Sequence, residues 1–412
     1  MTKTMYMNMT RGMAMLLLLA VSVLSCKKDR EELSGNAEIT VAYPEAFAES
    51  VAGGVEVTAT NVQNGSTEKA TTDASGVARF NGLRLGTYTF RAEQRLDAAL
   101  ALALTGTGSE LFLNAIVRDV SIAQDETVTR ELILNGAPLA GLVFKEVYYT
   151  GSKTPADAEG RQSNYFSDQF IELYNNSDET IYLDGLCIGD LHGVSGVINP
   201  NDAPSLLTQD RNHVYVSNVW RVPGSGQQHP LLPGESIIIA QDGVNHKEFN
   251  PNSPVDLSGA DWETYNERPD GRDADNPDVP NLERVYFTGG FDWLITVFGP
   301  SVVIFRVDDF NALDKVPDPR DPEGEWASPI VKLPIGHVID SFEALKDANS
   351  GSFKRIPVAL NSGFAFASDT YTMESFRRKV VGEESGRRIL QNTNDSGEDF
   401  EKLVLPTPKR FD

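Results

Sequence analysis

Hydrophobic and polar residues alternate along this chain in short runs, and the clearest run is FIELYNNSDETIYLDGLCI at 170–188. Ile171 and Leu173 recur with a period of two, which predicts a half-buried strand. The Asn-Asn-Ser-Asp sequence at 175–178 favours a turn, because these side chains bond to nearby backbone. Alternation resumes at 181–183. The stretch therefore predicts a β-hairpin.

Similar alternation fills the N-terminal third of the chain. Apolar and polar residues alternate at 55–60, and an Asn-Gly pair at 64–65 is a strong hairpin signal. The run TDASGVARFNGLRLGTYTFRA follows at 72–92, and a last alternating segment lies at 126–134. The Ala/Leu-rich run at 96–104 leaves an inserted helix and a buried strand as alternatives.

Asn-Gly-Ala-Pro at 135–138 predicts a boundary, after which several apolar runs indicate further strands. The clearest of these runs are at 142–149, 232–240, 301–305 and 336–340. The one clear helix signal covers 341–348, with Asp340 or Ser341 as its cap and Gly351 near its end. Three loop-rich insertions separate the expected strands, at about 151–168, 241–290 and 308–329.

The run at 72–92 resembles carboxypeptidase regulatory-like domains, which are small prealbumin-type sandwiches. Gly76 permits the positive φ of the turn, while Phe80, Leu85 and Tyr88 are expected to fill one core. The resemblance implies a spacer or docking module over 37–135.

The hairpin at 170–188 resembles the signature of lamin-tail domains, which are immunoglobulin-like sandwiches. The resemblance continues with LPGESIIIA at 232–240, SFRR at 375–378 and PTP at 406–408. It implies an expanded lamin-tail-like sandwich over 140–412. The whole layout also resembles an uncharacterised family of bacterial lipoproteins, the domain of unknown function numbered 4876. We therefore expect an all-β fold with two immunoglobulin-like or prealbumin-like β-sandwich domains, the second with long loop insertions.

A basic and apolar leader opens the chain. Lys3 and Arg11 precede an apolar run at 13–23, shorter than the roughly 20 residues that a membrane-spanning helix needs. Such a leader is typical of a secretory signal over 1–25. It ends in Leu-Ser-Cys, which resembles a bacterial lipobox and implies lipid attachment at Cys26. An ordinary spanning anchor is the alternative.

Residues 26–36 carry many charges and no periodicity, so they predict a short tether. Lipidation implies an outer-membrane lipoprotein, on either the cell surface or the periplasmic face. The formal net charge of the chain is −23. Because acidic surfaces repel nucleic-acid phosphates and anionic headgroups, we expect no nucleic-acid partner and a membrane contact through the lipid alone.

The residues suited to catalysis do not form a recognisable motif. The chain has five histidines that lie far apart, and it lacks HExxH, GxSxG, phosphate-loop and dinucleotide signatures. Cys187, between apolar neighbours, is expected to be a buried small hydrophobe. Glu172 is the best-placed single carboxylate, but as a strand residue it favours a structural role over acid–base work. We expect no catalytic residue and no bound cofactor.

The insertion at 241–290 is the densest in acids. Asp270, Asp273, Asp275 and Asp278 alternate with other residues in a pattern that could wrap a calcium ion, although it is not an EF-hand. A solvated acidic loop is the alternative.

Trp262 and Tyr265 lie beside these acids, and loops on a rigid β scaffold are where binding groups usually sit. The insertion is therefore predicted to carry the recognition surface. The alternative is that Trp262 anchors the loop to the core.

Together these features predict a non-catalytic, membrane-anchored binding or scaffolding lipoprotein. Its expected partners are a glycan or an outer-membrane transporter of the TonB-dependent type, the latter inferred from this general type of lipoprotein. A secreted hydrolase acting on glycans or phosphoesters is the alternative, because lamin-tail domains also occur attached to such enzymes.

Overall fold

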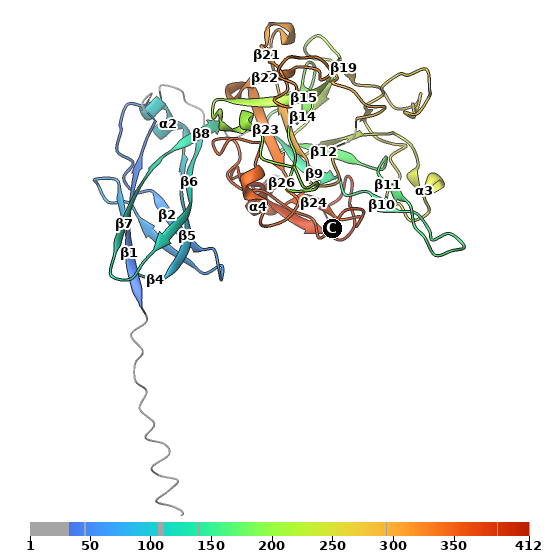
Figure 1. Ribbon diagram of the computed structural model, residues 1–412. Coiled ribbons are helices and arrows are strands. Elements are labelled where there is room, and N and C mark those ends of the chain that lie inside the picture. The colour runs from blue at the N-terminus through green and yellow to red at the C-terminus, as the bar shows by residue number, and fades with distance from the viewer. Residues whose placement is uncertain are drawn as a thin grey trace, which may run out of the picture.

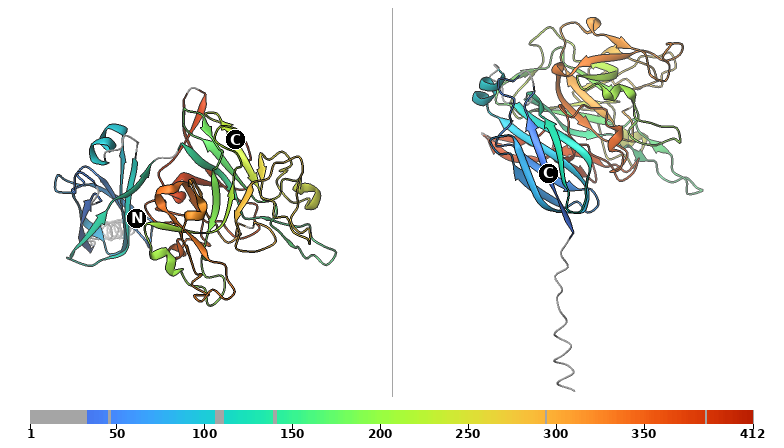
Figure 2. Two further views of the ribbon diagram at one scale, coloured as in Figure 1. Left: turned by 90° about the horizontal axis from the view of Figure 1, so that it is seen from above. Right: turned by 60° about the vertical axis from the view of Figure 1, so that its left-hand side comes forward.

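The computed structural model describes residues 33–44, 47–105, 111–138, 141–293, 295–384 and 386–411. The predicted signal segment and Cys26 lie outside these ranges. The described chain forms two lobes that lie side by side, and strands make up most of the regular secondary structure in both (Figures 1 and 2). The expected all-β architecture is confirmed. None of the helices in the described ranges is long and apolar enough to cross a membrane.

The first lobe consists of two sheets that enclose one core. The three-stranded sheet runs in the order β4 (Val77–Arg84), β1 (Ser34–Ala42) and β7 (Thr127–Ile133). The five-stranded sheet runs in the order β3 (Thr67–Thr71), β2 (Glu56–Asn61), β5 (Gly86–Leu96), β6 (Leu111–Ile122) and β8 (Asn135–Pro138). Buried residues alternate with half-exposed ones along β1, as expected for a strand with one face on the core.

The Ala/Leu run of this lobe is a helix rather than a strand. It forms α2 (Ala98–Thr105), which begins where the Asp97 carboxylate accepts a hydrogen bond of 2.8 Å from the backbone N–H of Leu100. This is the usual contact of a helix N-cap. Ala101 and Leu104 on the helix pack into the lobe's core.

The second lobe is a larger sandwich of two sheets. One sheet runs in the order β18 (Trp262–Glu263), β17 (Ser236–Ala240), β12 (Phe170–Asn175), β9 (Leu142–Tyr148), β24 (Ser375–Arg378) and β27 (Phe400–Leu403). The other runs in the order β21 (Lys315–Val316), β22 (Ile330–Pro334), β15 (His213–Arg221), β14 (Cys187–Leu191), β20 (Ser301–Phe305) and β23 (Val338–Glu343), and β19 (Glu283–Tyr286) pairs with β15. The core between them includes Leu173, Trp220 and Phe342.

Short elements connect these strands. They are the pairs β10 (Ser152–Lys153) with β11 (Asn164–Tyr165), β13 (Ile181–Tyr182) with β16 (Pro230–Leu231), and β25 (Val380–Glu384) with β26 (Arg387–Leu390). The helices are α3 (His246–Phe249) and α4 (Ser396–Asp399), with 3₁₀ turns at Leu206–Gln209, Phe310–Ala312, Ile335–His337 and Gly351–Phe353.

Strand β12 differs from the half-buried strand that its alternation predicts, because every one of its residues is buried. Ile171 and Leu173 face the sandwich core, whereas Phe170 packs on the other face of the sheet. That second face is covered by residues of the 241–290 insertion, so no side of the strand remains for water. The covering residues are Val255, Leu257, Ala260 and Val279.

The predicted helix at 341–348 is wrong. Residues 338–343 form β23, which pairs antiparallel with β20, so that Phe342 lies opposite Val302. The local cap signal at Asp340 and Ser341 is overridden by this pairing, which buries Phe342 completely.

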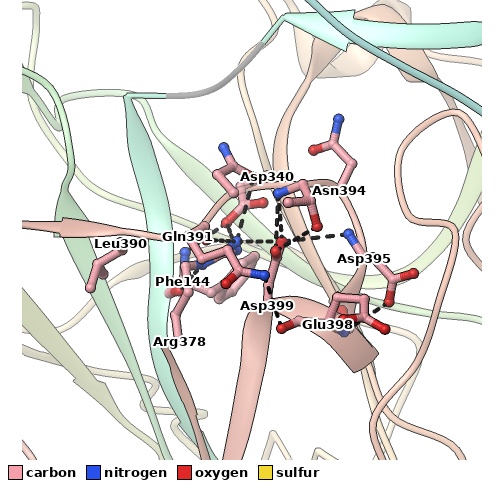
Figure 3. Close-up of polar contacts among 12 residues, drawn as sticks. Phe144, Asp340, Arg378, Leu390, Gln391, Asn394, Asp395, Glu398 and Asp399 are labelled. Atoms are coloured by element: carbon pink, nitrogen blue, oxygen red, sulfur yellow. Dashed lines mark hydrogen bonds and ion pairs between the residues drawn. The ribbon is translucent and has the colours of Figure 1, made fainter. Parts of the chain in front are cut away.

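A buried arginine ties the end of the chain to the sandwich. Arg378 is 1% exposed and its guanidinium reaches Asp340 at 2.7 Å and Asp399 at 3.0 Å (Figure 3). The same group donates to the carbonyl of Phe144 at 2.8 Å. These bonds give the buried cation two counter-charges and fix β24 against β9.

Candidate binding cavity and acidic cluster

The larger lobe contains a cavity of about 530 Å³ at one end of its seven-stranded sheet. Strands supply Asp190 near the end of β14, Ser217 and Asn218 from the middle of β15, and Ser301 at the start of β20. The remaining wall comes from loops. It includes His192, Asn201, Asp202, Ser205, Thr288, Thr296, Arg320 and Arg355.

Asp190 is held in one position by two donors. Its Oδ1 accepts hydrogen bonds from the Trp293 indole at 2.7 Å and from the Asn218 amide at 2.9 Å. Burial raises the pKa of Asp190, and these two hydrogen bonds oppose the rise. The Asn218 Oδ1 in turn accepts from the backbone N–H of Thr288 at 2.9 Å. The cavity wall is thus preorganised rather than loose.

The cationic groups of the cavity are also constrained. Arg355 is buried and donates through Nη2 to the carbonyls of Gly299 at 2.7 Å and Ala344 at 3.0 Å. Arg320 pairs with the buried Asp318 at 2.5 Å. Hydroxyl, amide, carboxylate and guanidinium groups therefore face one space, a combination that suits a ligand with many hydroxyls.

A cluster of three carboxylates includes the residue before Trp293, whose indole donates to Asp190 of the cavity. It consists of Asp242, Asp273 and Asp292, and one oxygen from each lies within 4.8 Å of the others. The three residues are only 6%, 5% and 4% exposed. Asp242 follows β17, Asp273 belongs to the insertion, and Asp292 precedes the Trp293 that bonds to Asp190.

Hydrogen bonds hold the carboxylates of the cluster in place. The Asp273 Oδ2 accepts from the backbone N–H of Asn266 at 2.8 Å, and the Asn266 amide donates to the carbonyl of Phe291 at 3.1 Å. The Asp292 Oδ2 accepts from the Gln241 amide nitrogen. Oδ1 of each of the three carboxylates has no hydrogen-bond partner, and neither has Oε1 of Gln241.

The pKa values of the cluster follow from its burial and its charge. Burial and the neighbouring carboxylates raise the pKa of Asp242 to about 9 and that of Asp273 to about 7. Burial raises the pKa of Asp292 to about 6, and the bond from Gln241 opposes the rise. Glu263 adds further negative charge, and burial raises its pKa to about 7.

The structure does not bring together the four acids predicted to bind calcium. Asp273 lies in the cluster, but Asp270 is exposed and pairs with Arg268 at 3.1 Å and Arg272 at 3.0 Å. The exposed Asp275 accepts a bond from Asn281. Asp278 is exposed as well. The physical reason is that, within the stretch 270–278, only Asp273 is buried, because its carboxylate accepts the backbone N–H of Asn266.

The two aromatic residues predicted for the recognition surface, Trp262 and Tyr265, differ in how deeply they are buried. Trp262 is 7% exposed, pairs in β18 with Ile239 of β17, and packs edge-on against the ring of His229 at 5.0 Å. It is therefore an anchor of the insertion, which was the alternative interpretation. Tyr265 is half-buried.

The residues weighed for catalysis have structural partners. Glu172 is fully buried and pairs with Lys145 at 2.8 Å, while its Oε2 accepts from the backbone N–H of Lys409. Cys187 is 1% exposed, and burial raises the pKa of its thiol to about 11. Among the described residues, the three aspartates form the one group with metal-ligand spacing, and it contains no histidine.

A family model described as a protein of unknown function (DUF4876) matches residues 232–407. A crystal structure of a DUF4876 family protein from Bacteroides thetaiotaomicron VPI-5482 matches with a TM-score of 0.58 and 26% identity, over 91% of this chain and 96% of that chain. The predicted resemblance to DUF4876 is confirmed. The segment that matches the DUF4876 model contains all three aspartates of the cluster.

Other comparisons add little to the DUF4876 match. The full-length major pilin SpaD from Corynebacterium diphtheriae matches at 14% identity over 44% of this chain and 47% of the pilin, and its TM-score of 0.18 carries no argument. No curated protein matches the sequence.

Sequence reasoning missed Asp242 and Asp292 as members of a site. Asp242 stands in a Gln-Asp-Gly turn directly after the predicted strand at 232–240, and Asp292 lies two residues after a Gly-Gly pair. An acid after a strand end was therefore the available signal for Asp242 alone, and its partners lie tens of residues away along the chain.

Proposed function

We propose that this chain is a non-catalytic binding or scaffolding lipoprotein of the outer membrane, attached through Cys26. In this proposal the larger lobe takes a polyhydroxylated ligand, a segment of glycan, in the cavity beside Asp190. An outer-membrane transporter of the TonB-dependent type is the proposed protein partner, to which the bound glycan would be delivered.

The cavity is the observation that carries this proposal. Its volume of about 530 Å³ falls within the range of small-molecule sites, and its lining is rich in hydrogen-bonding groups. Asp190 and Asn218 are fixed by the bonds to Trp293 and Thr288, so a ligand would meet a rigid polar wall. Rigid polar walls lose little conformational entropy on binding.

A hydrolase is supported less well by the same groups. Glycoside hydrolysis needs two carboxylates that face one bond, one of them free to give up a proton. Asp190 is occupied by Trp293 and Asn218, and Asp202 accepts backbone N–H bonds from Ile198 at 2.9 Å and Asn199 at 2.7 Å. These contacts suit positioning and binding rather than proton transfer.

A variant that fills the cavity tests whether the glycan binds there. Ser217 is half-buried in the cavity wall, so Ser217→Trp would occupy the space that a sugar needs. The wild-type protein is expected to bind members of an array of plant, fungal and mucin glycans, and the variant is expected to lose at least ten-fold in affinity by titration calorimetry. Ser225→Trp, in an exposed loop, is the matched control. An array without a hit, or equal affinity of wild type and Ser217→Trp, would contradict the proposal.

The anchor is tested separately. Cells fed an alkyne fatty acid should label the wild-type protein and the Cys187→Ala variant, since Cys187 is buried, but not Cys26→Ala. The labelled protein should fractionate with the outer membrane. If Cys26→Ala is labelled as strongly as the wild type, lipid attachment at Cys26 is refuted. The proposed glycan binding in the cavity is not affected by that result.

A further inference from the structure

The acidic cluster contains more negative charge than its surroundings neutralise. Within the described part of the chain, no lysine, arginine or histidine forms an ion pair with Asp242, Asp273 or Asp292. Arg268 and Arg272 of the insertion pair with the exposed Asp270 instead, and Arg284 donates to the side-chain oxygen of Asn266. Carboxylates buried without a counter-charge carry a large desolvation cost unless they take up a proton or a cation.

The cluster offers several oxygen atoms to a cation. One carboxylate oxygen from each aspartate lies within 4.8 Å of the others, and Oδ1 of all three aspartates lacks a hydrogen-bond donor. The Oε1 of Gln241, a residue 3% exposed whose amide nitrogen bonds to Asp292, is a fourth buried acceptor without a donor. Four acceptor oxygens without donors are unusual in a protein interior, where buried polar groups are nearly always satisfied.

The chemistry of these ligands selects the kind of ion. Oxygen-only ligands suit hard divalent cations, whereas zinc and copper favour nitrogen or sulfur. His246 is the histidine beside Asp242, but its two ring nitrogens are already engaged, with Tyr165 at 2.7 Å and with the Asp242 carbonyl at 3.0 Å. Calcium accepts six to eight oxygens in flexible geometry, while magnesium retains several waters that a buried site cannot hold.

We propose that Asp242, Asp273 and Asp292 bind one calcium ion. The ion would join three segments that are remote in sequence: the turn after β17, the middle of the 241–290 insertion, and the residue before Trp293. Because Trp293 donates to Asp190, the bound ion would also fix one wall of the cavity. The site differs from the calcium site predicted by sequence, with which it shares only Asp273.

Binding of calcium is tested on the purified full-length protein after treatment with chelator. Equilibrium dialysis with radioactive calcium should find one ion per chain, and excess magnesium should not displace it. Thermal melting should rise by about 5 °C or more when calcium is added at roughly a hundred times its dissociation constant, because the ion binds the folded state alone.

Two sets of variants separate this site from the acidic loop. Asp242→Asn and Asp292→Asn should each abolish binding and the calcium-dependent rise in melting temperature. Without calcium, both should melt no lower than the wild type, since each removes one of the mutually repelling charges. The control Asp270→Asn/Asp275→Asn changes exposed acids of the same insertion and should bind calcium as the wild type does.

The proposal is overturned if dialysis finds no calcium on the wild type. It is equally overturned if binding persists in both Asp242→Asn and Asp292→Asn, or is lost only in the Asp270→Asn/Asp275→Asn control. None of these results depends on a glycan being found for the cavity, so the two proposals fail separately.

Discussion

At the scale of single residues, Asp168 shows how burial makes a carboxylate respond to pH. It is completely buried, and its Oδ2 accepts hydrogen bonds from Ser253 at 2.7 Å, Ser152 at 2.8 Å and Tyr148 at 3.2 Å. Burial raises the pKa of Asp168 from 3.8 to about 6, and the three hydroxyl donors oppose the rise. The folded protein therefore holds this proton more tightly than the unfolded chain does.

The sign of the resulting pH dependence is fixed by linkage. The contribution of Asp168 to stability is fully present below pH 3.8 and is lost as the pH rises through about 6. The difference of about two pKa units corresponds to about 3 kcal/mol. Between pH 4 and pH 7, the unfolding free energy of the wild type should therefore fall by about 2 kcal/mol relative to that of Asp168→Asn, which does not titrate.

Urea unfolding at a series of pH values measures this difference directly, and other titrating groups cancel in the comparison. The exposed Asp178→Asn variant serves as the control and should follow the wild-type curve. Parallel curves for wild type and Asp168→Asn would show that Asp168 does not titrate in this range.

At the scale of elements, the 241–290 insertion is part of the fold. Its residues Val255, Leu257 and Val279 form a small core with Tyr148 and with the outer faces of β12 and β17. The sequence predicted a loop-rich insertion between strands that carries a recognition surface. The insertion is instead a third layer, which explains why β12 is buried on both faces.

Removing the anchor of this layer should therefore cost stability. Trp262→Ala is expected to lower the free energy of unfolding by about 3–5 kcal/mol, the usual effect of deleting a large buried side chain. Trp326→Ala removes a tryptophan that is 67% exposed, so it should change the free energy of unfolding by less than about 0.5 kcal/mol. Urea unfolding of the two variants measures both effects, and equal losses would show that Trp262 does not anchor the insertion.

The same elements show what sequence can and cannot predict. Alternation and turn residues were sufficient for strands such as 170–175, 236–240 and 301–305, because each pattern is local. The helix expected at 341–348 failed because the pairing of Phe342 with Val302 is invisible to local capping signals. The acidic cluster was missed for a related reason, since Asp242 and Asp292 meet only when the insertion folds back onto β17.

At the scale of the whole molecule, the two lobes are joined by more than the connecting chain. Arg91 of β5 pairs with the buried Asp395, and Arg118 of β6 donates to the carbonyl of Ser362 at 3.2 Å. Asp395 also caps α4 by accepting from the backbone N–H of Gly397 at 2.8 Å. The last residue of α4, Asp399, pairs with Arg378, so the contact between the lobes is continuous with the buried network of Figure 3.

A double-mutant cycle on Arg91 and Asp395 should therefore show coupling between the lobes. Arg91→Met removes the arginine that pairs with the buried Asp395, whereas Asp395→Asn keeps a side-chain oxygen for the cap of α4 and removes the charge. The interaction free energy from urea unfolding is expected at about 1–3 kcal/mol. Small-angle scattering of Arg91→Met should also show a larger radius of gyration, because the lobes lose their principal charged contact.

The control for this cycle is Arg79→Met. Arg79 pairs with Asp73 and Glu38 on the exposed surface of the first lobe, so its loss should cost less than about 1 kcal/mol and leave the scattering unchanged. If the effects of Arg91→Met and Asp395→Asn add within about 0.5 kcal/mol, and the scattering of Arg91→Met matches that of Arg79→Met, the ion pair does not couple the lobes. The two lobes would then be held by the connecting chain and by other contacts, such as the hydrogen bond from Arg118 to the carbonyl of Ser362.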